Sequence, residues 1–236
     1  MLEKIFKLQA HGTTVRTEVL AGITTFLTMA YIIFVNPSVL AKTGMDHGAV
    51  FVATCIAAAI GSFIMGFYAN LPVALAPGMG LNAFFTYTVV MQLGYTWQTA
   101  LGCVFFSGVL FIIVSLLRIR EWLINAIPNA LKKSIAAGIG GFLAFIALQS
   151  AGIIVGADGV LVRMGSIISF APLMTALCLF LIIAFVHYRV PGSVMLAILI
   201  ISVLGVLFGD KQVPESLVSL PPSLAPTFMQ MDLKSA

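Results

Sequence analysis

The chain has 236 residues, of which 61% are apolar and only 8% carry a charge, and its mean hydropathy is +1.12. Soluble domains average roughly 45 to 50% apolar and about 25% charged residues, so a soluble fold is excluded. The net charge of +4 does not indicate a nucleic-acid partner, because the basic residues stand singly or in pairs at the ends of apolar runs. The three cysteines show no CxxC spacing and are interpreted as small buried side chains, and we expect no metal and no cofactor.

Apolar runs long enough to cross about 30 Å of hydrocarbon recur along the chain. In lipid every backbone polar group must be paired within the chain, so these runs predict an all-α polytopic membrane protein. Six runs are uninterrupted: 19–35, 49–68, 100–117, 134–155, 171–186 and 192–208. The first is expected to be a retained span rather than a signal peptide, because no small-x-small cleavage site follows it.

Two shorter stretches differ from these runs in composition. Residues 119–130 are predicted to form a short helix in the cytoplasmic interface, with a simple loop as the alternative. Residues 210–236 are polar and rich in proline, and they are predicted to form an extended outer loop.

A seventh run, 71–92, is long enough to cross but contains two prolines, two glycines and an asparagine within eleven residues. Charge decides whether it crosses, because basic residues collect on the cytoplasmic side of a bacterial-type inner membrane. If it crosses, the N-terminus is cytoplasmic and the basic residues divide eight to four: Lys4, Lys7, Arg16, Arg118, Arg120, Lys132, Lys133 and Arg189 against Lys42, Arg163, Lys211 and Lys234. If it does not cross, the bias largely vanishes. We therefore expect seven spans, and a second copy of such an odd-numbered unit would be inverted, as in many secondary transporters.

The third of these seven segments is predicted to be a broken helix. Pro72 and Pro77 each remove a backbone donor and disfavour helical geometry just before them, so residues 73–76 are expected to form a short strand. A half-helix is expected to resume with Pro77 at its first position, which suits proline. Its unpaired N–H groups would then lie inside the membrane and need a partner.

The residues after the break predict a ligand site. Gly78 and Gly80 have no side chains to keep a ligand from the backbone, and the amide of Asn82 offers both a donor and an acceptor. A planar polar heterocycle would satisfy these groups. The competing interpretation is a kinked packing helix, and we favour the site because the break contains more proline and glycine than one kink requires.

Three further observations concern the polar residues of the first span, the acidic residues of the spans and the motifs of enzymes. Thr28 and Tyr31 extend a polar stripe on the first span that either lines a solute path or only packs, since threonines often bond to their own helix. No Asp or Glu lies inside any of the seven predicted spans, although proton-coupled carriers usually need an intramembrane carboxylate. The absence of HExxH and GxSxG motifs argues against an enzyme.

Five stretches of the sequence resemble a known transporter family. They are HGTTVRTE (11–18), GITTFLTMAY (22–31), VNP (35–37), AVFVAT (49–54) and NLPVALAPGMGLNAFF (70–85). Together they are similar to the N-terminal half of the adenine/guanine/hypoxanthine permeases, the AzgA-like branch of the nucleobase-ascorbate transporter superfamily. The similarity runs through all seven predicted spans and is most specific before Phe85.

The resemblance implies a fold of fourteen spans in two inverted repeats of seven, divided into a core domain and a gate domain. Residues 1–118 would hold core spans one to four, 119–209 the interfacial helix and gate spans five to seven, and 210–236 a loop leading to a second repeat. The family's base-binding and proton-coupling carboxylates lie in the eighth and tenth spans, which these 236 residues do not contain. The substrate contacts implied for this chain are Gly78, Met79, Gly80 and Asn82, with Thr28 and Tyr31 opposite.

These expectations lead to the hypothesis of a purine nucleobase:proton symporter that takes up adenine, guanine or hypoxanthine by alternating access. The lipid bilayer surrounds it, and a homodimer remains an option for its assembly. Two alternatives stay open. The missing carboxylate motivates a non-transporting membrane half that has no activity or serves only as an interaction partner. The fold also suits a uracil, xanthine or anion carrier.

Overall fold

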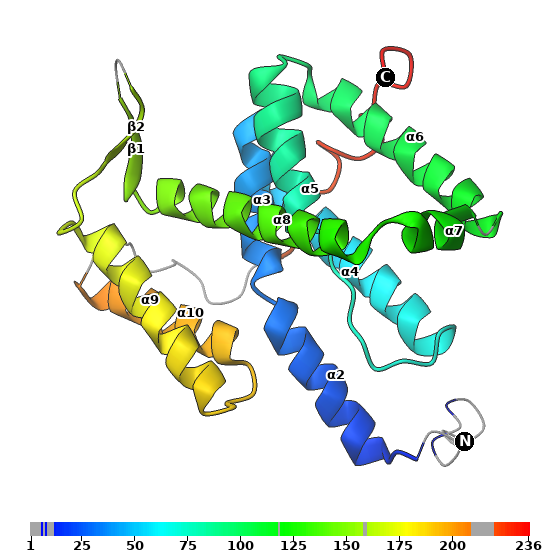
Figure 1. Ribbon diagram of the computed structural model, residues 1–236, viewed down its shortest axis with the longest axis horizontal. Helices are drawn as coiled ribbons and strands as arrows, with labels where there is room; N and C mark the ends of the chain where they lie inside the picture. The colour runs from blue at the N-terminus through cyan, green and yellow to red at the C-terminus, as the bar shows by residue number, and fades with distance from the viewer. Residues whose placement is uncertain (1–5, 7, 9–11, 118, 158–159, 209–219) are drawn as a thin grey trace.

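The computed structural model describes residues 6, 8, 12–117, 119–157, 160–208 and 220–236, and most of them are helical (Figure 1). The helices are α2 (Val15–Met29), α3 (Ile32–Leu40), the 3-10 helix η1 (Ala41–Thr43), α4 (His47–Phe67), α5 (Met79–Ala83), the π-helix η2 (Phe84–Gln92), α6 (Trp97–Leu116), α7 (Ile119–Ala126), α8 (Asn129–Ser150), α9 (Phe170–His187) and α10 (Ser193–Phe208). Strands β1 (Ile154–Ala157) and β2 (Val160–Met164) form an antiparallel hairpin. Lys4, Lys7, Arg118 and Lys211 of the charge count, and 209–219 of the predicted outer loop, lie outside the described residues.

Five helices within the described residues are long and apolar enough to cross a membrane: Val15–Thr43, His47–Phe67, Trp97–Leu116, Asn129–Ser150 and Phe170–His187. The multi-pass membrane architecture is therefore confirmed. The other two predicted spans are helical but shorter. Helix α10 has 16 residues, or about 24 Å at 1.5 Å per residue, and the third segment is helical only over α5 and η2. Seven complete crossings and the inverted repeat stay predictions.

The apolar side chains of these helices mostly point outward. Phe63 on α4, Leu110 on α6 and Phe180 on α9 are between 62% and 72% exposed. In Figure 1, α9 and α10 form a pair at one side of the molecule, and α8 crosses in front of α3 and α5. Such surface is stable only against lipid tails or other apolar helices, which is the environment that the composition predicted.

Helix starts follow from the local sequence. The side chain of Thr14 accepts a hydrogen bond from the N–H of Thr17 at the start of α2, and Thr96 does the same for Thr99 at the start of α6. At the start of α4, a side-chain oxygen of Asp46 lies 2.7 Å from the backbone nitrogen of Ala49. Each cap pairs an N–H that the helix itself leaves without a partner.

The buried apolar cluster lies where η1, η2 and the first turns of α4 and α6 meet. It consists of Met45, Val50, Phe85 and Ala100, each at most 7% exposed. The C-terminal segment 220–236 lies against the same end of α6, where the N–H of Asp232 donates to the carbonyl oxygen of Gln98 at 3.0 Å. The buried apolar cluster and the contact with the C-terminal segment therefore lie at the same end of α6.

Three local predictions are wrong. Residues 71–78 form no strand, because a strand requires a hydrogen-bonded neighbour and the described residues supply none. Pro77 is not the first helical residue: α5 begins at Met79, with Gly78 as the capping residue in an extended conformation. The chain is not all-α, since the predicted fifth span ends at Ser150 and Ile154 pairs with Met164 in the hairpin.

Candidate functional site

The interruption of the third segment begins at the end of α4. Asn70 adopts a left-handed conformation with φ of +54°, which turns the chain after Phe67, and its side-chain nitrogen donates to the carbonyl oxygen of Phe6 at 2.9 Å. Asparagine tolerates this conformation better than most residues with a side chain. The eight residues 71–78 then run without helix back along α4.

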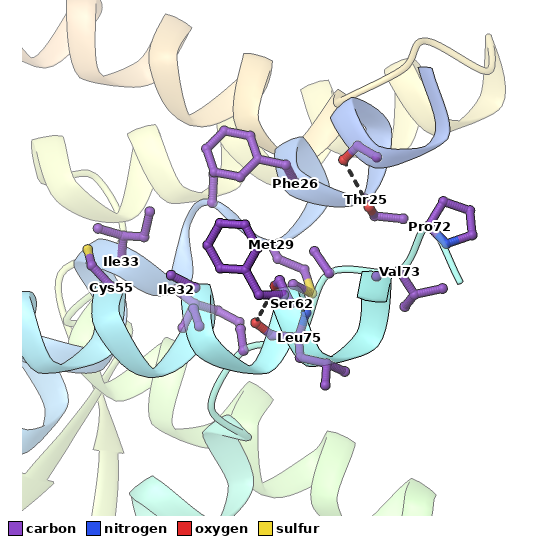
Figure 2. Close-up of a pocket in the computed structure, with 18 of the residues that line it drawn as sticks. Thr25, Phe26, Met29, Ile32, Ile33, Cys55, Ser62, Pro72, Val73 and Leu75 are labelled. Atoms are coloured by element: carbon purple, nitrogen blue, oxygen red, sulfur yellow. Dashed lines mark hydrogen bonds between the residues drawn. The ribbon is translucent and has the colours of Figure 1, made fainter. Parts of the chain in front are cut away.

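Two residues of α4 hold this non-helical segment in place. The N–H of Leu75 donates to the hydroxyl oxygen of Ser62 at 3.0 Å, and that hydroxyl group lies 3.4 Å from the carbonyl oxygen of Leu75 (Figure 2). Gly61 permits the close approach, because a Cβ atom at that position would lie 3.3 Å from Cβ of Leu75. Ser62 therefore pairs backbone groups of Leu75, in a segment that has no neighbouring strand to bond to.

A cavity of about 630 Å³ opens between this segment, α4 and the turn that joins α2 to α3 (Figure 2). Apolar side chains make up most of its wall, including Phe26, Met29, Val73 and Leu75. We call it the apolar groove. Of the predicted site residues only Pro72 lines it, so the groove and the predicted polar site are different places.

Asn82 on α5 belongs to a chain of hydrogen bonds that connects α5, α3 and α4. Its side-chain nitrogen Nδ2 lies 2.5 Å from Oδ1 of Asn36, 46 positions earlier in the sequence. Nδ2 of Asn36 donates to Oγ1 of Thr54 at 2.8 Å, and the Thr54 hydroxyl donates to the carbonyl oxygen of Val50 at 2.7 Å. Asn36 and Thr54 are each only 3% exposed.

Asn36 and Thr54 were not among the residues predicted from the sequence. Both lie within stretches that carry the family resemblance, at 35–37 and 49–54, but neither was interpreted as a partner of Asn82. One signal was available, since an asparagine in an otherwise apolar helix must find a hydrogen-bond partner in lipid. The identity of that partner depends on how α3, α4 and α5 pack.

The glycines around the start of α5 have different surroundings. A Cβ atom at Gly78 would meet nothing within 4 Å, so the backbone there is open as predicted. A Cβ atom at Gly80 would lie 3.2 Å from Cγ2 of Ile139 on α8, so this glycine permits helix packing. Met79 between them is half-buried.

Thr28 and Tyr31 lie at the break between α2 and α3. The Thr28 hydroxyl donates to the carbonyl oxygen of Thr25 at 2.8 Å, within its own helix. Tyr31 is half-buried in the turn, and neither residue lines the apolar groove as the described residues define it. The structure does not bring this pair into hydrogen-bond contact with Asn82.

The second half of the third segment is a π-helix, which the sequence did not predict. In η2 the hydroxyl of the fully buried Thr86 donates to the carbonyl oxygen of Val39 on α3 at 3.4 Å. Helices of this type occur mostly as short insertions near functional sites. The π-helix therefore begins two residues after Asn82, the last of the residues predicted to bind a ligand.

The membrane-length helices and the interrupted third segment define a multi-pass membrane protein of a transporter type. A match to the permease family covers residues 16–234. The chain therefore belongs to the permease family, whose members are transporters and not enzymes.

Three relatives refine this assignment. The adenine permease AdeP of Escherichia coli is 45% identical over 99% of this chain and 52% of its own length. The guanine/hypoxanthine permease PbuG of Bacillus subtilis is 44% identical over 97% of this chain and 54% of its own length. The guanine/hypoxanthine permease GhxP of Escherichia coli O157:H7 is 40% identical over 95% of this chain and 50% of its own length. The chain spans about half the length of these curated relatives, and it matches their N-terminal half, so the resemblance stated from the motifs is confirmed.

Proposed function

We propose that this chain is the first repeat of a purine nucleobase permease that takes up adenine, guanine or hypoxanthine together with a proton. The observation that carries the proposal is the interruption of the third segment, where the open backbone at Gly78 lies four residues before Asn82. The names of AdeP, PbuG and GhxP describe permeases for adenine or for guanine and hypoxanthine, which supports a purine as the ligand.

In the proposed site the base contacts the third segment. Pro72 and Pro77 keep residues 71–78 out of the helix, and Gly78, Met79 and Gly80 offer backbone groups at the resulting gap. Asn82 contributes its side-chain amide. Thr28 and Tyr31 of the first span complete the site once the transporter closes around the base, since in this structure they stand apart from Asn82.

Transport proceeds by alternating access in this proposal, with residues 1–118 as the core and 119–209 as the gate. Two glycine contacts join these parts: Gly80 meets Ile139 of α8, and Gly192 lets the start of α10 approach Leu27 of α2, where a Cβ atom would lie 3.2 Å from Leu27 Cδ1. Glycine lets helices approach closely, and small sliding movements of packed helices are one known form of domain movement.

Proton coupling in this proposal uses carboxylates outside these 236 residues, because the membrane-length helices of the described residues contain one carboxylate, Glu18, which lies in the first turn of α2 and not in mid-span. The protein lies in a bacterial-type inner membrane with a cytoplasmic N-terminus, which the eight-to-four division of basic residues supports.

The test is uptake of radiolabelled adenine, hypoxanthine and guanine by bacteria that lack their own purine carriers and express the complete reading frame containing this chain. We expect saturable uptake of at least one base, lost when a protonophore collapses the proton gradient. Unlabelled uracil and xanthine serve as competitors that identify a carrier of another specificity. If none of the three bases enters above the empty-vector level, the proposed function is wrong.

A matched variant tests the site. Asn82→Ala should raise the KM for the transported base at least about tenfold, the usual effect of losing one or two polar contacts to a ligand. Leu81→Ala is the control, because the Leu81 side chain is 77% exposed on the same helix. If Asn82→Ala instead removes the protein from the membrane, Asn82 has only a structural role.

A further inference from the structure

The hydrogen bonds from Asn82 to Val50 all run in one direction. The carbonyl oxygen of Val50 can only accept, so the Thr54 hydroxyl uses its single hydrogen on that bond. Oγ1 of Thr54 can then only accept from Asn36, which means that the NH₂ group of Asn36 faces Thr54 and its Oδ1 faces Asn82. Asn82 must therefore donate with its own NH₂ group.

This direction determines which groups Asn82 has left for a ligand. One N–H of its amide is used by Asn36, and no hydrogen bond to its Oδ1 is formed by the described residues. Asn82 is only half-buried, whereas Asn36 and Thr54 are each 3% exposed. Thr54 also lines the apolar groove, but its hydroxyl and the amide of Asn36 are already used in hydrogen bonds to protein atoms. The free groups are a carbonyl oxygen and the second N–H.

We propose that Asn36 and Thr54 are positioning residues that hold the Asn82 amide in one orientation, so that it offers its carbonyl oxygen to an N–H of the base. This inference rests on the proposed function. A purine edge that carries a donor beside an acceptor is complementary to an amide held in this way, as in the contacts of asparagine with adenine. Without these hydrogen bonds, the Asn82 amide can rotate by 180° and exchange the positions of its donor and acceptor.

The series of hydrogen bonds that starts at Asn82 ends on α4, which makes Thr54 the most informative residue to change. Thr54→Val keeps the shape of the side chain and removes the hydroxyl, so Asn36 loses the acceptor that orients it. Thr54→Ser keeps the hydroxyl and removes a methyl group, and it should therefore retain the function of Thr54. Thr24→Val is the control, because the Thr24 hydroxyl bonds only to the carbonyl oxygen of Leu20 in its own helix.

The experiment measures hypoxanthine uptake against concentration for each variant of the complete reading frame, divided by the amount of protein in the membrane. We expect Thr54→Val to raise KM about tenfold with Vmax within about twofold of the wild type, since an interaction with bound substrate is lost. Thr54→Ser and Thr24→Val should keep the KM of the wild type. Asn36→Leu, which removes both the acceptor for Asn82 and the donor to Thr54, should also raise KM.

Each other outcome has a definite meaning. If the wild type takes up purines and Thr54→Val leaves KM unchanged, the positioning role is wrong while the proposed function stands. If Thr54→Ser is as defective as Thr54→Val, the methyl group and not the hydroxyl matters, and the positioning role is again wrong. For a variant of low abundance, stabilisation of the purified protein by hypoxanthine replaces uptake, and equal stabilisation of Thr54→Val and wild type overturns the inference. If the wild type neither transports nor is stabilised by any purine, the proposed function fails.

Discussion

The backbone nitrogen of Leu75 lies 3.0 Å from Oγ of Ser62, and this bond attaches the non-helical segment 71–78 to α4. Backbone groups inside a membrane need partners as they do in a protein core, because hydrocarbon supplies none. The hydroxyl of Ser62 accepts from the N–H of Leu75 at 3.0 Å, and its oxygen lies 3.4 Å from the carbonyl oxygen of the same residue. The non-helical part of the third segment therefore depends on the side chain of Ser62 on α4, the helix of the second predicted span.

Ser62→Ala should lower the free energy of unfolding by about 1 to 2 kcal/mol, because the N–H of Leu75 loses its partner. The measurement is thermal unfolding of the purified protein in detergent. Ser202→Ala is the control, since the Ser202 hydroxyl bonds to the carbonyl oxygen of Ile198 in its own helix. Equal melting temperatures for the two variants would contradict this role of Ser62.

Alanine at Gly61 and at Gly66 should have different effects on stability, although both glycines lie on α4. Alanine favours a helix over glycine by about 1 kcal/mol, and a Cβ atom at Gly66 meets nothing within 4 Å, so Gly66→Ala should stabilise. At Gly61 the new atom lies 3.3 Å from Cβ of Leu75, and this crowding should cancel the gain. Thermal unfolding of both variants measures the difference, and equal stabilisation would show that the segment does not lie against Gly61.

Gly80→Leu should separate α5 from α8, because even a Cβ atom at this position would lie 3.2 Å from Cγ2 of Ile139. Crowding of this kind usually destabilises by about 1 to 3 kcal/mol. Ile139→Ala removes the opposing side chain, so the double variant should be more stable than Gly80→Leu alone. A double-mutant cycle on unfolding free energies gives the coupling, and additive effects would contradict the contact.

Gly102→Leu should displace the C-terminal segment 220–236 from α6. A Cβ atom at Gly102 would clash with the carbonyl oxygen of Asp232 and lie 2.6 Å from Cβ of Ala236. Hydrogen exchange of residues 220–236 should become faster, because the bond from Asp232 to Gln98 is lost. Gly108→Leu is the control on the same helix, where a Cβ atom meets nothing within 4 Å. Unchanged exchange in Gly102→Leu would show that the segment does not depend on this approach.

The interruption of the third segment was predictable because it follows from covalent chemistry. Proline lacks an N–H and restricts the residue before it, so Pro72 and Pro77 exclude a helix wherever the segment packs. The helix resumed two residues later than predicted, at Met79, because the choice between Pro77 and Gly78 as the boundary depends on neighbours of the segment. For the same reason the expected strand at 73–76 did not form, since pairing requires a second strand.

Composition by itself determined that the chain is a membrane protein with long apolar helices, because lipid accepts only segments that pair their own backbone. The position of Asn82 beside the break was likewise visible in the sequence. Only the tertiary structure decided that Asn82 donates to Asn36, 46 positions away, and that Asn36 in turn donates to Thr54. A hydrogen bond between distant residues depends on the distance and angle at which three helices pack, and no local pattern of residues encodes that geometry.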